Sequence, residues 1–160
     1  MTLIDDGDLI KGLGFVALYA AYLEEAIDEC VGALFMGDQV QYDKIMRKPS
    51  SQKIEWIQDR LKSLMPLTKE LGHFPGHLDV VVKLLEERNL VIHGRVYAVP
   101  GEGDVRYAGR KGIPTEVAKS SELYELANDL FRACDPLMAA SMFAFQRLFH
   151  AKREIDNSST

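Results

Sequence analysis

The chain has 160 residues, of which 47% are hydrophobic and 27% are charged, a composition that is ordinary for one globular domain. This composition argues against global disorder, and no apolar run approaches the roughly 20 residues that a membrane-spanning helix needs. The net charge of −5 argues against a protein that coats nucleic acid nonspecifically, but it leaves room for a local basic site. The N-terminus contains Asp5 and Asp6 where a secretory signal peptide would be basic, so we expect a cytoplasmic protein that does not enter a membrane.

An apolar stripe predicts a long first helix over residues 8–35. Its members recur alternately four and three positions apart, which places them on one helical face. They are Leu9, Leu13, Val16, Ala20, Leu23, Ile27, Cys30 and Leu34. Gly12 and Gly14 weaken the first turns, and Gly37 is the expected stop.

A group of carboxylates crowds the region beside this stripe. Its members are Glu24, Glu25, Asp28 and Glu29. We interpret the group as a solvated face of the first helix. The alternative is that one of the carboxylates lies near a dimer site.

The middle of the chain predicts a polar connector and two further helices. Residues 38–49 contain a short helix around 42–47, and a serine of Pro49-Ser50-Ser51 is available to cap the next helix. That helix presents Ile54, Ile57, Leu61 and Leu64, and it ends before Pro66. The stretch from Gly72 to Gly76 contains Pro75 and predicts a break. A third helix is expected over residues 77–93, with Gly94 as its C-terminal cap.

Residues 95–113 predict a short β-hairpin or an extended flap, because apolar residues alternate on both sides of a Pro-Gly turn. Four cationic side chains make this segment locally basic. They are Arg95, Arg106, Arg110 and Lys111. Ser120 is the expected cap of a last helical region whose three-four stripe runs to Leu148, and Pro136 should kink or divide that region. Trp56 and the phenylalanines of this last region are expected in the core.

These elements predict an all-α fold, a bundle of four to five helices with the hairpin or flap inserted at about 95–113. Amphipathic helices that each carry one apolar stripe can bury their stripes only against one another or against a partner. We expect one domain over residues 1–155 and a frayed tail over residues 156–160. Long stripes on the first and last helices favour a remaining apolar face for a second copy of the chain.

Cysteines and most histidines give weak functional signals. Cys30 and Cys134 fall on apolar stripes and are interpreted as reduced core thiols, with a disulfide or a catalytic thiol as alternatives. His73 and His77 are four residues apart, but the predicted break between them argues against a zinc site. We therefore expect neither a metal nor a cofactor.

The segment Arg88-Asn89-Leu90-Val91-Ile92-His93 carries the strongest chemical signal. Asn89 and His93 are four residues apart and share a helical face, whereas Arg88 lies about 140° around the axis from His93. An imidazole can transfer a proton at neutral pH, and a guanidinium can clamp phosphate oxygens. The trio therefore suits phosphodiester chemistry. The structural alternative is a polar helix end, with His93 acting as a capping cation.

The same segment resembles the motif of the HEPN family (higher eukaryotes and prokaryotes nucleotide-binding) of helical RNA-processing proteins. In that family an Arg is followed by a polar residue, often Asn, and by a His after four to six intervening residues. Here Arg88 and Asn89 precede His93 with four residues between Arg and His. Further similarity extends over nearly the whole chain, including Leu23-Glu24-Glu25 and Gln52-Lys53-Ile54, but only the short motif is specific.

The resemblance implies a homodimer in which two motifs meet and act as a metal-independent endoribonuclease, such as a toxin or a phage-defence effector. By carry-over, His93 is the general base or acid, Arg88 the phosphate clamp and Asn89 a positioning residue. The 2′-hydroxyl of the RNA would attack and leave a 2′,3′-cyclic phosphate. A catalytically silent module that binds RNA or a partner protein is the alternative, and a helical dimerisation protein is a third.

The chain departs from one group of the family. Toxins that pair with a nucleotidyltransferase antitoxin often carry Tyr two residues after the His. Here that position is Arg95, and the nearest tyrosine is Tyr97. This departure puts that particular antitoxin partnership in doubt.

Overall fold

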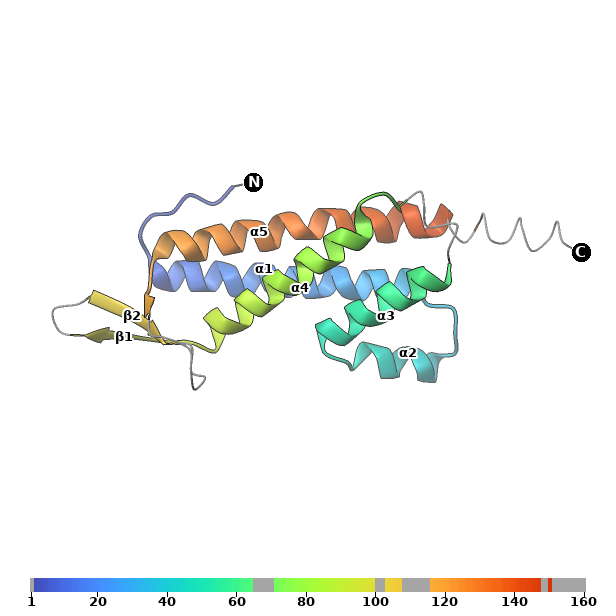
Figure 1. The fold of residues 1–160 in the computed structure, drawn as a ribbon, viewed down its shortest axis with the longest axis horizontal. Helices are drawn as coiled ribbons and strands as arrows, with labels where there is room; N and C mark the ends of the chain where they lie inside the picture. The colour runs from blue at the N-terminus through green and yellow to red at the C-terminus, as the bar shows by residue number, and fades with distance from the viewer. Residues whose placement is uncertain (1, 65–70, 100–102, 108–115, 148–149, 151–160) are drawn as a thin grey trace, which may run out of the picture. The chain divides into compact units, whose positions relative to one another are not determined.

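The computed structural model describes residues 2–64, 71–99, 103–107, 116–147 and 150. The elements within these ranges are the helices α1 (Leu9–Leu34), α2 (Gln39–Met46), α3 (Ser50–Ser63), α4 (Phe74–Ile92) and α5 (Ser120–Ala139), the π-helical segment η2 (Ala140–Ala144), and the strands β1 (Arg95–Val99), β2 (Gly103–Tyr107) and β3 (Glu116–Val117) (Figure 1). The strands form an antiparallel sheet in the order β1-β2-β3. The predicted all-α class with an inserted hairpin is thus confirmed.

The described chain divides into two compact units. Unit 1 comprises Met1–Tyr22 and Lys83–Arg132, and unit 2 comprises Leu23–Val82 and Ala133–Thr160. Helices α1, α4 and α5 each contribute residues to both units. The single domain over residues 1–155 stays a prediction, and the expected tail at 156–160 lies outside the described residues.

In unit 1, α1 packs closely against α5 through aromatic side chains. The rings of Phe15 and Tyr124 meet edge to face at 5.7 Å, and those of Tyr19 and Phe131 are 5.0 Å apart. Gly12 permits this approach, because a Cβ atom at that position would lie only 3.0 Å from the Cβ atom of Leu123. Gly12 is therefore a packing residue, which its position in the first turns of a helix does not reveal.

A pair of alanine substitutions separates this packing role from helix propensity. Gly14→Ala should raise the free energy of unfolding by about 0.5–1 kcal/mol, because glycine is that unfavourable inside a helix and no atom lies within 4 Å of the new methyl group. Gly12→Ala gains the same propensity but overpacks, at a typical cost of about 1–3 kcal/mol, so we expect a net loss of about 1 kcal/mol. Urea unfolding measures both, and equal stabilisation by the two variants would contradict the assigned close approach.

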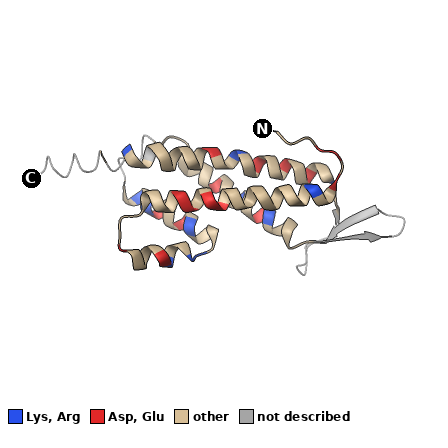
Figure 2. Ribbon diagram, turned by 180° about the vertical axis from the view of Figure 1, so that it is seen from behind, with Lys and Arg blue, Asp and Glu red and all other residues tan. Residues whose placement is uncertain are grey.

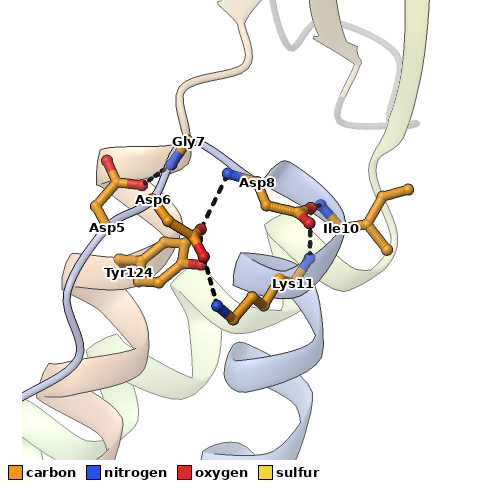
Figure 3. A network of polar contacts seen from close by, with 7 residues as sticks. All are labelled: Asp5, Asp6, Gly7, Asp8, Ile10, Lys11 and Tyr124. Carbon is orange, nitrogen blue, oxygen red and sulfur yellow. Dashed lines mark hydrogen bonds and ion pairs between the residues drawn. The ribbon is translucent and has the colours of Figure 1, made fainter.

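The residues before α1 form a strap, defined here as residues 3–8, that is bonded to α5. The backbone N–H of Leu3 donates to Asn128 Oδ1 at 2.8 Å. Figure 3 shows the contact between Tyr124 and Asp6, in which the tyrosine hydroxyl donates to Asp6 Oδ1 at 2.6 Å. Lys11 pairs with the other oxygen of Asp6. Asp8 caps α1, accepting from the N–H of Lys11 at 3.0 Å. The strap is thus held by polar contacts from a residue in α1 and from residues in α5.

These contacts shift two pKa values in opposite directions. The hydrogen bonds from Lys11 and then Tyr124 hold the pKa of the Asp6 carboxyl well below its usual range. Burial, followed by the hydrogen bond to Asp6, raises the pKa of Tyr124 to about 12. The lowered pKa of the carboxyl stabilises the folded state at any pH above its ordinary pKa of about 3.9. The raised pKa of the phenol stabilises the folded state at any pH below its ordinary pKa of about 10.

We therefore expect the strap to loosen as the pH falls below about 4 and again as it rises above about 10. The amide resonance of Leu3, followed by NMR across this range, reports the loss of its bond to Asn128. Asp6→Asn should weaken both transitions, whereas Asp5→Asn, which leaves the contact between Asp6 and Tyr124 in place, should keep them. A Leu3 amide that titrates identically in wild type and Asp6→Asn would contradict this account.

In unit 2, two carboxylates of α1 bind α3. The ammonium group of Lys53 is buried and forms an ion pair with Asp28, and the hydroxyl of Ser50 donates to Glu24 at 3.4 Å. The red bands of Asp and Glu positions mark this stretch of the α1 ribbon in Figure 2. The prediction of a wholly solvated acidic face is therefore wrong for Glu24 and Asp28, while Glu25 and Glu29 are exposed.

Both serines that were expected to cap helices make tertiary contacts instead. Ser50 is the first residue of α3 and follows Pro49, the N-cap residue, which makes no side-chain capping bond. Ser120 begins α5, and its hydroxyl donates to Asp5 Oδ2 of the strap at 3.1 Å. A serine hydroxyl satisfies a carboxylate as readily as a helix end, so the local pattern alone does not decide between the two.

The predicted break at residues 72–76 is confirmed only for Gly72 and His73, which form a turn, and it is wrong for the rest, because α4 begins at Phe74 and includes Pro75 and Gly76. Proline is tolerated in the first turn of a helix, where its missing N–H would have no helical partner. Gly72 precedes the helix with a φ of 55°, a left-handed conformation that suits glycine. The N–H of His77 donates to the carbonyl of His73 at 3.0 Å, which closes the first turn.

Helix α5 continues through Pro136 to Ala139 and then changes to the π-helical segment η2. Proline removes a backbone donor, and the wider π turn follows directly. The apolar register shifts here, because Phe145 is fully buried whereas Phe143 is 59% exposed. The core prediction is wrong for Phe143, and Trp56 is half-buried.

Candidate functional site

The Arg88-Asn89…His93 motif lies at the C-terminal end of α4, in unit 1. Val91 is buried at this end, and its side chain anchors the last turn in the core. Leu90 and Ile92 beside it are 41% and 38% exposed. The motif is therefore carried by a helix end that has one buried side and one accessible side.

A helical hydrogen bond determines how Asn89 and His93 lie. The N–H of His93 donates to the carbonyl of Asn89 at 3.1 Å, so the i to i+4 geometry continues to the histidine. Both side chains are exposed. The expectation that Asn89 and His93 share one helical face is confirmed for the backbone, and because both side chains are exposed they can reach a ligand from solvent.

Arg88 occupies a different environment. It is half-buried, and its Nε atom is screened from solvent. Five residues separate it from His93, which corresponds to about 140° around the helix axis. Only a guanidinium on an extended side chain could join the imidazole on the same helix, whereas an arginine from a second copy faces no such constraint.

The basic hairpin starts immediately after the motif. Gly94 donates its N–H to the carbonyl of Val91 at 3.2 Å, and β1 begins at the next residue, Arg95. The register pairs Arg95 with Tyr107 and Val96 with Arg106. Arg95 and Arg106 therefore occupy neighbouring backbone positions at the end of the hairpin that joins α4. The other two predicted cations, Arg110 and Lys111, lie outside the described residues.

Two carboxylates, Glu86 and Glu87, precede the motif on α4 and are both exposed. Glu86 lies seven residues before His93, almost two full turns, so it is on the same side of the helix. Because carboxylates repel phosphate, an anionic ligand at His93 needs cations from the hairpin or from another chain.

Neither cysteine lies in an environment that activates its thiol. Cys30 and Cys134 are buried free thiols, and the Cys30 thiol donates to the carbonyl of Leu137 at 3.3 Å. Burial raises the pKa of Cys30 to about 12 and that of Cys134 to about 11. A thiol is nucleophilic only as the thiolate, so these values support the interpretation as core residues. Within the described ranges no three His, Cys, Asp or Glu side chains gather in a way that could hold a metal ion.

Comparison with known proteins finds no match to any family model, any curated protein or any solved structure. Among the described residues, no helix is both long and apolar enough to cross a membrane. The chain's own residues are therefore the basis for a functional assignment. The residues at the end of α4 suit phosphodiester chemistry best.

Proposed function

We propose that the protein is a metal-independent endoribonuclease of HEPN type, which acts as a homodimer. One observation carries the proposal: Asn89 and His93, which a helical hydrogen bond aligns at the C-terminal end of α4, are both exposed, and Arg88 directly precedes Asn89. A polar helix end that served only as a cap would not need an amide and an imidazole aligned toward solvent. A toxin or a phage-defence effector is the biological role that such an activity suits.

Each motif residue has a defined task in the proposed reaction. His93 takes the proton from the 2′-hydroxyl of the RNA or gives one to the leaving 5′-oxygen. The 2′-oxygen forms a bond to phosphorus as the bond to the 5′-oxygen breaks, which leaves a 2′,3′-cyclic phosphate. Arg88 binds the phosphate oxygens as negative charge increases, and Asn89 orients the imidazole or the phosphate.

A second copy of the chain would complete this site in two ways. It can place one Arg88 beside the other copy's His93, which the angle of about 140° on a single helix disfavours. It also covers Leu90 and Ile92, whose exposed apolar surface borders Asn89 and His93. Arg95 and Arg106, at the neighbouring end of the hairpin, would then supply positive charge for RNA phosphates.

The chemistry predicts a specific loss on mutation. RNA cleavage should persist in EDTA, because the proposed step uses only protein groups and the RNA's own hydroxyl, and DNA should remain intact. His93→Ala should lower kcat/KM by about 10²–10⁴-fold, the usual effect of removing a general acid or base. Arg88→Lys should also be strongly impaired, because an ammonium group lacks the planar two-pronged donor. Product analysis by mass spectrometry should find cyclic phosphate ends.

His150→Ala is the matched control, because His150 is also exposed but lies outside the motif. It should cleave RNA at the wild-type rate. Cleavage that requires magnesium, or a His93→Ala variant with full activity, would exclude the mechanism. Circular dichroism should show that all variants fold, because neither Arg88 nor His93 belongs to the buried core.

The proposed dimer has its own test. Wild type should be a dimer with two-fold symmetry at micromolar concentration, with α4 of both copies in the interface. Ile92→Asp places a charge in that interface and should shift the protein to monomer in light scattering. Val80→Asp is the control, because Val80 is 48% exposed on α4 but lies away from the motif. A wild-type monomer, or an equal effect of the two substitutions, would contradict this interface.

A second candidate is a catalytically silent HEPN module that binds a partner protein, such as an antitoxin, or RNA. The exposed carboxylates of Glu86 and Glu87 favour it, because they repel phosphate from the face that carries His93. Exposed Leu90 and Ile92 would then dock against the partner. A wild-type dimer that leaves RNA of every tested sequence intact supports this candidate over the nuclease.

A further inference from the structure

A pocket with an apolar wall and a few basic side chains lies in unit 2, where the start of α4 meets the end of α5 and η2. It has a volume of about 450 Å³, within the size range of small-molecule sites. Its wall includes His73 and His77 from the start of α4, and Phe143 and Arg147 from η2 and the turn after it. All of these residues belong to unit 2, so the pocket is built within one compact body.

The charge of this pocket is opposite to that of the chain. Its titratable wall residues are two histidines and an arginine, and no Asp or Glu is among the described residues that line it. Two other cavities in the described part of the chain mix both charges. The one beside the strap includes Arg132 together with Asp5, Glu125 and Asp129, and the one beside α3 includes Lys62 together with Asp79. The pocket of unit 2 thus differs from these two cavities, although the chain as a whole has a net charge of −5.

Local structure holds both histidines at the pocket. The ring Nε2 of His77 lies 3.0 Å from the carbonyl oxygen of Ala133, which identifies Nε2–H as the donor and fixes the ring. His73 is one turn earlier on the same face, as the bond from the His77 N–H to the His73 carbonyl requires. The first turn of α4 adds the positive end of the helix dipole.

An aromatic surface adjoins these basic groups. Phe143 lines the pocket while remaining 59% exposed, so one edge of its ring is accessible to a ligand. Its neighbour Phe74 also lines the pocket and meets the ring of buried Phe145 edge to face at 5.5 Å. The π-helical turn of η2 separates the outward Phe143 from the inward Phe145, and π segments often occur at functional sites.

We infer that this pocket binds a small phosphate monoester that carries a planar ring. The phosphate dianion fits the guanidinium of Arg147 beside the imidazole of His73, and the ring fits against Phe143. The inference concerns unit 2 only, and it does not depend on whether the motif in unit 1 cleaves RNA.

Three probes separate the two parts of the ligand. Phenyl phosphate carries both ring and dianion, inorganic phosphate lacks the ring, and phenol lacks the charge. Isothermal titration with the full chain should show phenyl phosphate binding at least about tenfold more tightly than either fragment, because each part adds a separate contact. Resonances of the His73 and His77 rings should shift at saturation.

Matched variants locate the site. Arg147→Gln and Phe143→Ala should each weaken phenyl phosphate about tenfold, the scale expected for losing one charged hydrogen bond or one ring contact. Arg47→Gln, another exposed arginine of unit 2, and Met142→Ala, which adjoins Phe143 but does not line the pocket, should bind as wild type. Unchanged activity on RNA in the pocket variants would separate this site from the motif.

Several results would overturn the inference. One is the absence of saturable binding up to about 10 mM phenyl phosphate, the weakest affinity worth assigning to a specific site. Another is equal affinity for phenol, which would mean that the basic groups contribute nothing. Loss of binding in the control variants as well as in Arg147→Gln would place the ligand elsewhere on the chain.

Discussion

The helical geometry of α4, maintained from Phe74 to the bond between His93 N–H and the Asn89 carbonyl, is the constraint on which both candidate sites depend. If the helix ended one turn earlier, Asn89 and His93 would no longer share a face, and the motif would be three unrelated polar residues. If it began one turn later, as its sequence suggests, His73 would leave the pocket wall. Buried Leu78, Val81, Leu84, Leu85 and Val91 keep the helix packed along its length.

Polar contacts between distant segments place the other helices. The buried ammonium group of Lys53 requires a partner, because an unpaired charge in the interior costs several kcal/mol. Asp28 supplies it, so the ion pair sets where α3 meets α1. Ser50 and Ser120 use their hydroxyls in the same way, on Glu24 and Asp5. Specific hydrogen bonds of this kind add less energy than burial but exclude alternative packings of amphipathic helices.

Most of the helices could be predicted from the sequence because apolar periodicity is a local signal. The stripe from Val16 to Leu34 is buried as expected, and the hairpin pairs as its alternation predicts. The predictions fail where a contact distant in the sequence or a position in a helix determines the structure. Gly12 is required by its close approach to Leu123. Pro75 is compatible with α4 only because it lies in the first turn. The motif residues could be found by spacing, but the half-burial of Arg88 and the pocket at Arg147 could not, since both depend on tertiary packing.

The charges around His93 constrain how an acidic chain could act on RNA. On α4 itself the motif offers one cation, Arg88, whereas Glu86 and Glu87 expose two carboxylates just before it. A single copy therefore has little net attraction for phosphate at His93. Two copies related by a two-fold axis would bring two arginines and two hairpins to one place while the apolar Leu90 and Ile92 are covered. Assembly and phosphate recognition would then be one event, so activity at this site should follow the dimer rather than the folded monomer.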